Sequence, residues 1–136
     1  MSDTTEARPI RGILLSHGAM AAGVVDAVRR ITGVDEDALV PVTNRGVSPE
    51  VLAVELRRHI GDGPAILFTD LQSGSCGFAA QRVARNVEGL VVISGINLPI
   101  LLEFVLNREL PIDELVPRLL EKGRAAICCS QPPAPR

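Results

Sequence analysis

Short apolar runs alternate with amphipathic helical patterns along this chain, and the alternation constrains its fold more than any other feature. Continuous apolar runs of three or four residues are typical of strands buried on both faces of a sheet. They occupy residues 13–15, 39–42, 65–68 and 90–93. Helical patterns follow them at about 19–32, 49–60, 78–86, 100–106 and 112–122. This order predicts an α/β fold: a doubly wound, mainly parallel sheet of four to five strands with helices on both faces.

Proline and glycine residues indicate where several of these elements begin or end. Ser48 followed by Pro49 predicts a helix start, because serine caps free N–H groups and proline suits the first turn. Pro41 places the second strand at a sheet edge, since proline cannot donate to a strand ladder. Gly123 is expected to end the last helix. Residues 125–129 then form a candidate fifth strand, paired within the chain or exchanged between protomers.

The 136 residues are enough for one domain of ordinary size. We expect a flexible arm at 1–10, one domain at 11–130 and a proline-rich tail at 131–136. The polar N-terminus lacks a signal-peptide pattern. Polar and helix-breaking residues interrupt 90–106, which predicts strand, turn and helix rather than a membrane span. Three cysteines without framework spacing favour reduced thiols, and we expect a cytoplasmic protein.

Composition argues against several functions. With 14 basic and 16 acidic residues, the net charge of −2 leaves no excess of basic side chains for nucleic-acid phosphates. Three Phe with no Trp or Tyr cannot form base-stacking platforms. The chain also lacks a G-x-x-x-x-G-K-[ST] phosphate loop, a G-x-G-x-x-G turn and a carboxylate cluster. We therefore expect no cofactor, no metal and no direct use of magnesium ATP.

The carboxyl ends of the first and third strands carry the residues best suited to chemistry. Open parallel sheets bind ligands at these ends, where the strand order reverses. In a sheet ordered 2-1-3-4 the crevice lies between the strand that precedes His17 and the strand that precedes Asp70. The topology therefore predicts that His17 and Asp70 face each other across the crevice.

A histidine paired with an aspartate is suited to accepting and passing on a phosphoryl group. Imidazole is a nucleophile at neutral pH, and a carboxylate fixes its tautomer and leaves the other nitrogen free to attack. N–H groups at the start of the next helix, near Ala19 and Met20, would face a bound anion. The candidate phosphate-binding residues are Gly18, Ala19, Ser73, Gly74 and Ser75.

Each of these residues also has a structural explanation. A single histidine after a strand is more often structural than catalytic, and Asp70 alone would serve as a helix cap. Cys76, in the same loop, is expected to be a small packing residue. A non-catalytic binding domain with a structural His17 is therefore an open alternative, although the chain lacks the aromatic residues that usually sandwich a flavin.

Three segments resemble the mannose-type IIA domains of the bacterial sugar phosphotransferase system. Residues 12–23 (GILLSHGAMAAG) resemble the family's active-histidine segment. Residues 68–75 (FTDLQSGS), followed by 78–80, resemble its aspartate-glycine-serine loop, and residues 94–103 (SGINLPILLE) resemble its glycine-x-asparagine-x-proline segment. The segments occur in the family's order, and the resemblance covers about residues 10 to 130.

The resemblance implies a flavodoxin-like fold, often in a homodimer, and a phosphotransferase component of sugar transport. It implies that His17 is the phosphorylated residue and Asp70 its partner. Phosphate would come from the histidine phosphocarrier HPr and pass to a separate IIB protein, with the membrane involved only through IIC and IID subunits. Asn97 and Pro99 match the third segment, near the crevice.

The aspartate loop departs from the family pattern D-x-x-G-G-S-P at two positions. Ser73 replaces a glycine, and Cys76 replaces the proline that opens the helix. The altered loop motivates a second hypothesis, a regulatory module that reports the phosphorylation state of the system by binding another protein. A further alternative is the phosphoryl-donor subunit of dihydroxyacetone kinase, which uses a similar domain.

Overall fold

The four predicted strands form one parallel sheet in the order β2-β1-β3-β4, which is the order that the predicted crevice requires. The computed structural model describes residues 8–131 and 133–135. Its strands are β1 (Arg11–Ser16), β2 (Leu39–Thr43), β3 (Ala65–Thr69) and β4 (Val91–Ser94). Pro41 lies in the edge strand β2, as predicted, where its missing N–H costs no ladder hydrogen bond.

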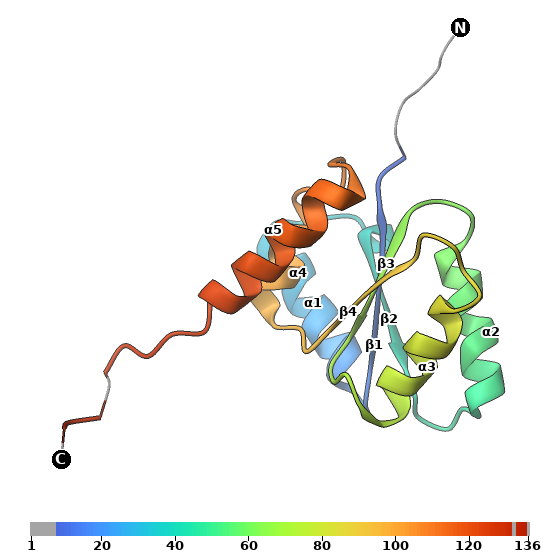
Figure 1. The fold of residues 1–136 in the computed structure, drawn as a ribbon, viewed down its shortest axis with the longest axis horizontal. Helices are drawn as coiled ribbons and strands as arrows, with labels where there is room; N and C mark the ends of the chain where they lie inside the picture. Colours follow the sequence, from blue (N-terminus) through green and yellow to red (C-terminus); the bar gives the residue numbers. More distant parts are fainter. Residues whose placement is uncertain (1–7, 132, 136) are drawn as a thin grey trace, which may run out of the picture.

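Helices cover both faces of the sheet (Figure 1). One face carries α1 (Met20–Thr32), α4 (Leu98–Val105) and α5 (Ile112–Ala125), and the other carries α2 (Pro49–Ile60) and α3 (Gly74–Ala84). A short 3-10 turn, η1 (Glu36–Ala38), leads into β2. The doubly wound architecture predicted from the sequence is therefore confirmed.

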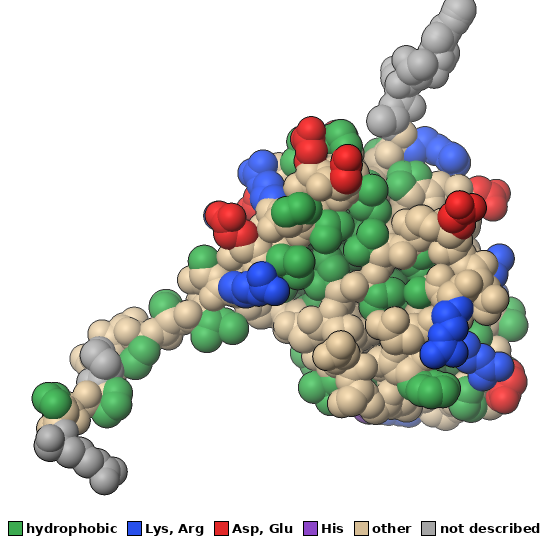
Figure 2. All heavy atoms as spheres, viewed as in Figure 1, with side chains coloured by type: hydrophobic (Ala, Val, Ile, Leu, Met, Phe, Trp, Pro, Cys, Tyr) green, Lys and Arg blue, Asp and Glu red, His purple; other side chains and the backbone are tan. Residues whose placement is uncertain are grey.

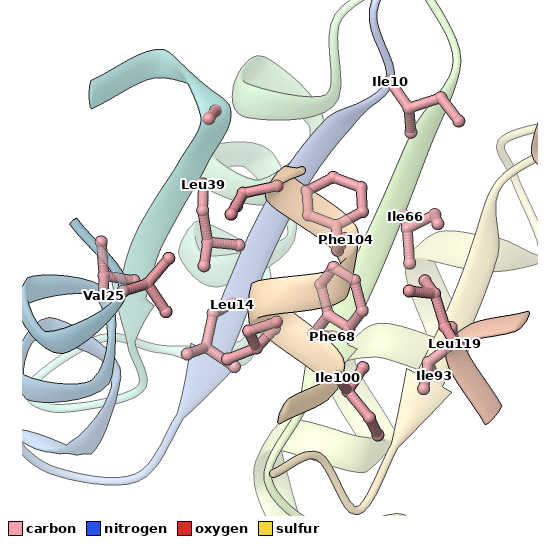
Figure 3. Packing of buried hydrophobic residues seen from close by; sticks show 14 of the residues in the cluster. Ile10, Leu14, Val25, Leu39, Ile66, Phe68, Ile93, Ile100, Phe104 and Leu119 are labelled. Carbon is pink, nitrogen blue, oxygen red and sulfur yellow. The ribbon is translucent and has the colours of Figure 1, made fainter. Parts of the chain in front are cut away.

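Alternate side chains of the central strands supply two separate cores. Leu14 of β1 packs on the face of α1, α4 and α5, whereas Ile13 and Leu15 pack on the face of α2 and α3. In the first core, Phe68 of β3 meets Phe104 of α4 edge to face, with ring centroids 5.1 Å apart and planes at 71° (Figure 3). Burial on both faces explains why the strands are continuous apolar runs.

The predicted helix start at Ser48 is confirmed. Its Oγ accepts a hydrogen bond from the Val51 N–H at 3.2 Å, and Pro49 is the first residue of α2. Asn97 caps α4 in the same way by accepting from the Ile100 N–H at 3.1 Å. These caps satisfy N–H groups that a helix leaves unpaired at its start.

The last helix is longer than predicted, and in the described residues 125–129 form no strand with the sheet of this chain, so the prediction of pairing within the chain is wrong. Exchange of this segment between protomers stays a prediction. Gly123 lies within α5 and does not end it. Its role is close packing against α4, because a Cβ at this position would overlap Ile100. The Gly123 carbonyl also accepts a hydrogen bond from the Asn97 amide at 2.9 Å. The helix therefore runs on to Ala125. The described residues after it, 126–131 and 133–135, are exposed and extend away from the body (Figure 1).

Strand β4 is consequently an edge of the sheet. Val91 and Val92 of this strand are only partly buried. Figure 2 shows hydrophobic side chains gathered in the middle of this side of the molecule, between α5 and α3. Among the described residues, the apolar surface of the sheet thus reaches solvent along β4.

Helix α3 begins at Gly74, four residues before its predicted start at 78. Gly77 allows this early start, because any Cβ at that position would overlap the backbone carbonyl of Gln72 in the preceding turn. The segment expected to be a loop is therefore partly helical. Ser73 occupies the N-cap position, and Ser75 and Cys76 lie in the first turn.

The predicted arm at 1–10 falls mostly on residues outside the described part of the chain, as do residues 132 and 136 of the predicted tail. Residues 90–106 contain β4 and α4, as predicted. None of the helices in the described residues has the length and apolar character needed to cross a membrane.

Two glycine substitutions test the account of α3. Gly77→Ala should lower the free energy of unfolding by about 1–3 kcal/mol, because the added methyl group collides with a backbone carbonyl. Gly23→Ala in α1 is the matched control, since a Cβ there meets no atom within 4 Å. It should stabilise the protein by about 0.5–1 kcal/mol through helix propensity. Urea denaturation measures both, and equal effects of the two changes would contradict the packing explanation.

Candidate functional site

The parallel register of β1 and β3 brings His17 and Asp70 together. Leu15 of β1 pairs with Thr69 of β3, so the residues that follow the two strands emerge side by side at the carboxyl edge of the sheet. The His17 Nδ1 atom lies 2.7 Å from the Asp70 Oδ2 atom. The predicted meeting of imidazole and carboxylate is therefore present in the structure.

Three hydrogen bonds hold the Asp70 carboxylate. Its Oδ2 accepts from the His17 backbone N–H at 3.0 Å and from the His17 ring, and its Oδ1 accepts from the Leu71 N–H at 2.9 Å. Burial by itself would raise the pKa of this carboxyl group, since its side chain is only 9% exposed. The hydrogen bonds from His17 and Leu71 outweigh burial, and the net result is an Asp70 pKa below its usual 3.8.

An ionised carboxylate at this distance determines the tautomer of the His17 ring. A carboxylate only accepts hydrogen bonds, so Nδ1 carries the ring proton and donates it to Asp70. The Nε2 atom of the neutral ring then holds the lone pair. The side chain of His17 is 42% exposed, and the Ser75 Oγ atom lies 3.4 Å from Nε2. The arrangement thus leaves one nucleophilic nitrogen accessible.

The predicted phosphate-binding residues divide into two groups. Gly74 and Ser75 lie against the ring: a Cβ on Gly74 would stand 3.7 Å from Nε2, and Gly74 itself adopts φ 81°. They open helix α3, whose N-terminus favours anions. Ser73 precedes them as an exposed N-cap residue whose side chain makes no capping hydrogen bond.

The other group follows His17 directly. Gly18 adopts φ 59°, a left-handed conformation that turns the chain from β1 into α1, and Ala19 is the exposed N-cap residue of that helix. The expectation that the Met20 N–H would face an anion is wrong, because it donates to the His17 carbonyl at 3.3 Å. The first turn of α3, rather than that of α1, lies beside the accessible ring nitrogen.

Three residues at the end of β2 and directly after it complete the site and were not identified from the sequence. The Asn44 amide donates to Ser75 Oγ at 2.8 Å, and the Thr43 hydroxyl donates to the Gly18 carbonyl at 2.9 Å. The Arg45 Nη2 atom lies 3.3 Å from where a Cβ on Gly18 would stand. A signal was available, because β2 pairs with β1 and ends at the same edge of the sheet.

A groove of about 610 Å³ adjoins the ring between α2 and α3. Asn44, Gly74 and Ser75 form its end nearest His17, and Phe78, 66% exposed, lies along it. The rest of its lining is mainly apolar, with a few charged side chains: Val47, Pro49, Glu50, Leu52, Ala79 and Arg82. A mainly apolar hollow therefore begins at Gly74 and Ser75, the residues that lie against the ring of the candidate nucleophile.

Cys76 lies beneath the histidine–aspartate pair and is fully buried. Burial, together with the nearby negative charge of Asp70, raises the pKa of the Cys76 thiol to about 11. The thiol packs in the core of α2 and α3, as the packing interpretation predicted. Its sulfur also lies close to the site: ligand atoms of His17, Asp70 and Cys76 all fall within 4.8 Å of one another.

Solved structures define the class of protein to which this fold and site belong. An EIIA component of the phosphotransferase system from Streptococcus agalactiae superposes with a TM-score of 0.81 at 26% identity, covering 88% of this chain and 96% of that one. The mannose/sorbose specific IIA subunit from Enterococcus faecalis superposes with a TM-score of 0.78 at 26% identity, covering 95% and 100%. The molecule has their flavodoxin-like α/β fold.

The sequence places the chain in the corresponding family. Residues 12–119 match the family model described as "PTS system fructose IIA component". The "PTS system sorbose-specific EIIA component" of Klebsiella pneumoniae is 32% identical over 127 residues, which cover 88% of this chain and 90% of that protein. The chain belongs to the family of IIA components of the sugar phosphotransferase system, which confirms the family indicated by its motifs.

The lowered pKa of Asp70 predicts how stability depends on pH. A carboxyl group whose folded-state pKa lies below its unfolded value stabilises the fold when ionised, and this contribution is lost as the pH falls through the folded-state pKa. Asp70→Asn should therefore be less stable than wild type near neutrality. The difference should shrink as the pH falls below the usual value of 3.8.

Urea denaturation across this pH range measures the effect. Asp26→Asn is the control, because Asp26 forms an exposed ion pair with Arg30 on α1 that contributes at most about 0.5 kcal/mol. A stability difference between Asp70→Asn and wild type that stays constant or grows on acidification would contradict the assignment.

Proposed function

We propose that this IIA component accepts a phosphoryl group on Nε2 of His17, from phosphorylated HPr, and passes it to a IIB protein. The observation that carries the proposal is the 2.7 Å contact of Nδ1 with Asp70, which directs the lone pair to the opposite, accessible nitrogen. Membership of the family supports the phosphotransferase role.

The transfer step needs no group beyond the two proteins. The Nε2 lone pair attacks the phosphorus of the phosphohistidine on HPr, an N–P bond forms on His17, and the N–P bond to the donor breaks, its electron pair returning to the donor ring. Positive charge develops on the His17 ring as the bond forms. Asp70 stabilises that charge through Nδ1–H, because it is ionised and already in contact. In the second transfer a nucleophile of IIB attacks the phosphorus, and the N–P bond to His17 breaks with its electron pair returning to the His17 ring.

Groups around Nε2 are suited to the phosphoryl oxygens. The N–H groups that open α3 and the Ser75 hydroxyl donate hydrogen bonds toward this position. The Asn44 amide orients that hydroxyl by donating to its oxygen. Arg45, beside Gly18, supplies a positive charge on the same edge. Ser73, Gly18 and Ala19 border the position without a direct contact to the ring in the hydrogen-bond network.

Substitution of the two histidines tests the acceptor. With radiolabelled phospho-HPr, His17→Ala should take up no acid-labile phosphate, because it lacks the nucleophile. His59→Ala is the matched control: His59 is the second of two histidines and lies at the end of α2, so this variant should be labelled at the wild-type rate. Labelled His17→Ala, or unlabelled wild type, would refute the assignment of the acceptor.

The role of Asp70 is tested by Asp70→Asn. Loss of the charged partner should slow uptake by roughly 10- to 100-fold, as for other partners that orient a reactive histidine. The variant should still reach full labelling, because Nε2 remains. Rapid-quench measurement of the uptake rate decides the point, and a rate equal to wild type would rule out orientation and charge stabilisation by Asp70.

The groove beside His17 is suited to contact the donor protein. A donor that brings phosphorus to Nε2 must cover the adjoining surface, and that surface is the groove with exposed Phe78. Phe78→Ser should raise KM for phospho-HPr about tenfold or more through lost apolar contact. Labelling by phosphoramidate, a small donor that needs no docking, should be unchanged. A parallel loss with both donors would show that the change damages the site itself.

The regulatory hypothesis shares the same acceptor and differs in the partner. Its specific support is the altered loop, in which exposed Ser73 lies at the rim of the site. Capture experiments with and without phosphorylated His17 separate the two. Transfer of label to a IIB protein supports the transport role, whereas phosphorylation-dependent binding of a different protein supports regulation.

A further inference from the structure

We propose that His17, Asp70 and Cys76 form a binding site for zinc(II) that competes with the phosphoryl group. The three side chains come from different parts of the fold: the end of β1, the end of β3 and the first turn of α3. Within the described part of the chain, this is the group of metal-ligating side chains whose ligand atoms converge. The expectation of no metal rested on the absence of a carboxylate cluster and on cysteines that lack the spacing of a zinc site. The three residues here combine one cysteine with a histidine and an aspartate from distant parts of the sequence.

The spacing of the ligand atoms is close to that of a zinc site. They all lie within 4.8 Å of one another. Zinc bonds of about 2.0–2.3 Å in a tetrahedron separate ligand atoms by roughly 3.3–3.7 Å. A separation at the 4.8 Å limit needs to close by about 1.1–1.5 Å, while the 2.7 Å His17–Asp70 contact opens by about 0.6–1.0 Å.

The donor set selects zinc over harder ions. A thiolate, an imidazole and a carboxylate are zinc ligands, whereas magnesium and calcium require oxygen atoms. On binding, the S–H bond of Cys76 breaks, its proton leaves to solvent and a Zn–S bond forms, with no oxidation or reduction. Solvent occupies the fourth position, and the 42% exposed side chain of His17 provides the entry side.

Zinc and phosphate would exclude each other at His17, a consequence that rests on the proposed function. A neutral imidazole has one nitrogen with a lone pair and one with a proton. If the metal takes Nε2, the nucleophile is occupied. If it takes Nδ1, the proton moves to Nε2 and removes the lone pair there. In either case the ring cannot attack phosphorus, so zinc would hold the carrier in an inactive state.

Thiol ligation is tested first, on unphosphorylated protein. The double variant Cys128→Ser/Cys129→Ser removes the two exposed cysteines and leaves Cys76 as the single thiol among the three of the chain. Titrated with cobalt(II), this variant should bind one ion per chain and develop the near-ultraviolet charge-transfer band of a cobalt–thiolate bond. Binding without that band, or no binding, would overturn the proposal.

Removal of each ligand provides the second test. In competition with a chromogenic chelator, Cys76→Ser should weaken zinc binding by at least about 100-fold, since loss of even an indirect partner of a metal ligand costs 10- to 100-fold. His17→Ala should weaken it similarly, and it keeps the test decisive if Cys76→Ser fails to fold, because His17 is partly exposed. The proposal would be overturned if His17→Ala bound zinc with wild-type affinity. It would also be overturned if only the Cys128→Ser/Cys129→Ser variant lost zinc binding, because zinc would then lie elsewhere.

Competition is tested last, with phospho-HPr and saturating zinc. In wild type, zinc should lower the uptake of label at least tenfold compared with the same protein in chelator. In Cys76→Ser, zinc should lower uptake much less, compared with that variant in chelator. Equal inhibition of both would refute the competition. Uptake of label in the presence of chelator tests the proposed phosphoryl transfer without zinc. Cobalt binding in the absence of phospho-HPr tests the metal site without phosphoryl transfer. Failure of the proposed function is therefore distinguishable from failure of the metal site.

Discussion

The hydrogen bond between the His17 ring and the Asp70 carboxylate organises the site, and it exists because β1 and β3 are neighbours. Their parallel register ends both strands at one edge, where the two side chains meet at 2.7 Å. The helical crossovers that separate these strands in sequence also bring β2 to the other side of β1. The same topology therefore provides the candidate nucleophile, its carboxylate partner and the polar side chains at the end of β2.

Much of the fold follows from local sequence patterns, and the exceptions have a common cause. The four strands and the cap at Ser48 agree with the patterns, because apolar runs, prolines and capping residues act locally. Gly123 was expected to end α5, and Gly77 lay before the predicted start of α3 at 78, but each is a glycine that allows close approach within a helix. Such a role depends on what lies opposite, Gln72 in one case and Ile100 in the other, and no local pattern reveals it.

In the site, too, the features set by strand topology could be predicted, whereas the features set by individual contacts could not. Strand-end reasoning predicted the pair of His17 and Asp70, and applied to β2 it would also have found Asn44. The proximity of the Cys76 sulfur depends on α3 starting at Gly74, which the sequence did not indicate. A residue expected only to pack therefore has its sulfur close to the ring of the candidate nucleophile.

The tautomer of His17 tests the central claim most directly. Nitrogen-15 NMR of the imidazole, with the ring in its neutral form, distinguishes a proton on Nδ1 from a proton on Nε2. A carboxylate in contact with Nδ1 should hold the proton there, and Asp70→Asn should reduce that preference. A wild-type ring protonated mainly on Nε2, or averaging freely between the two forms, would contradict the account.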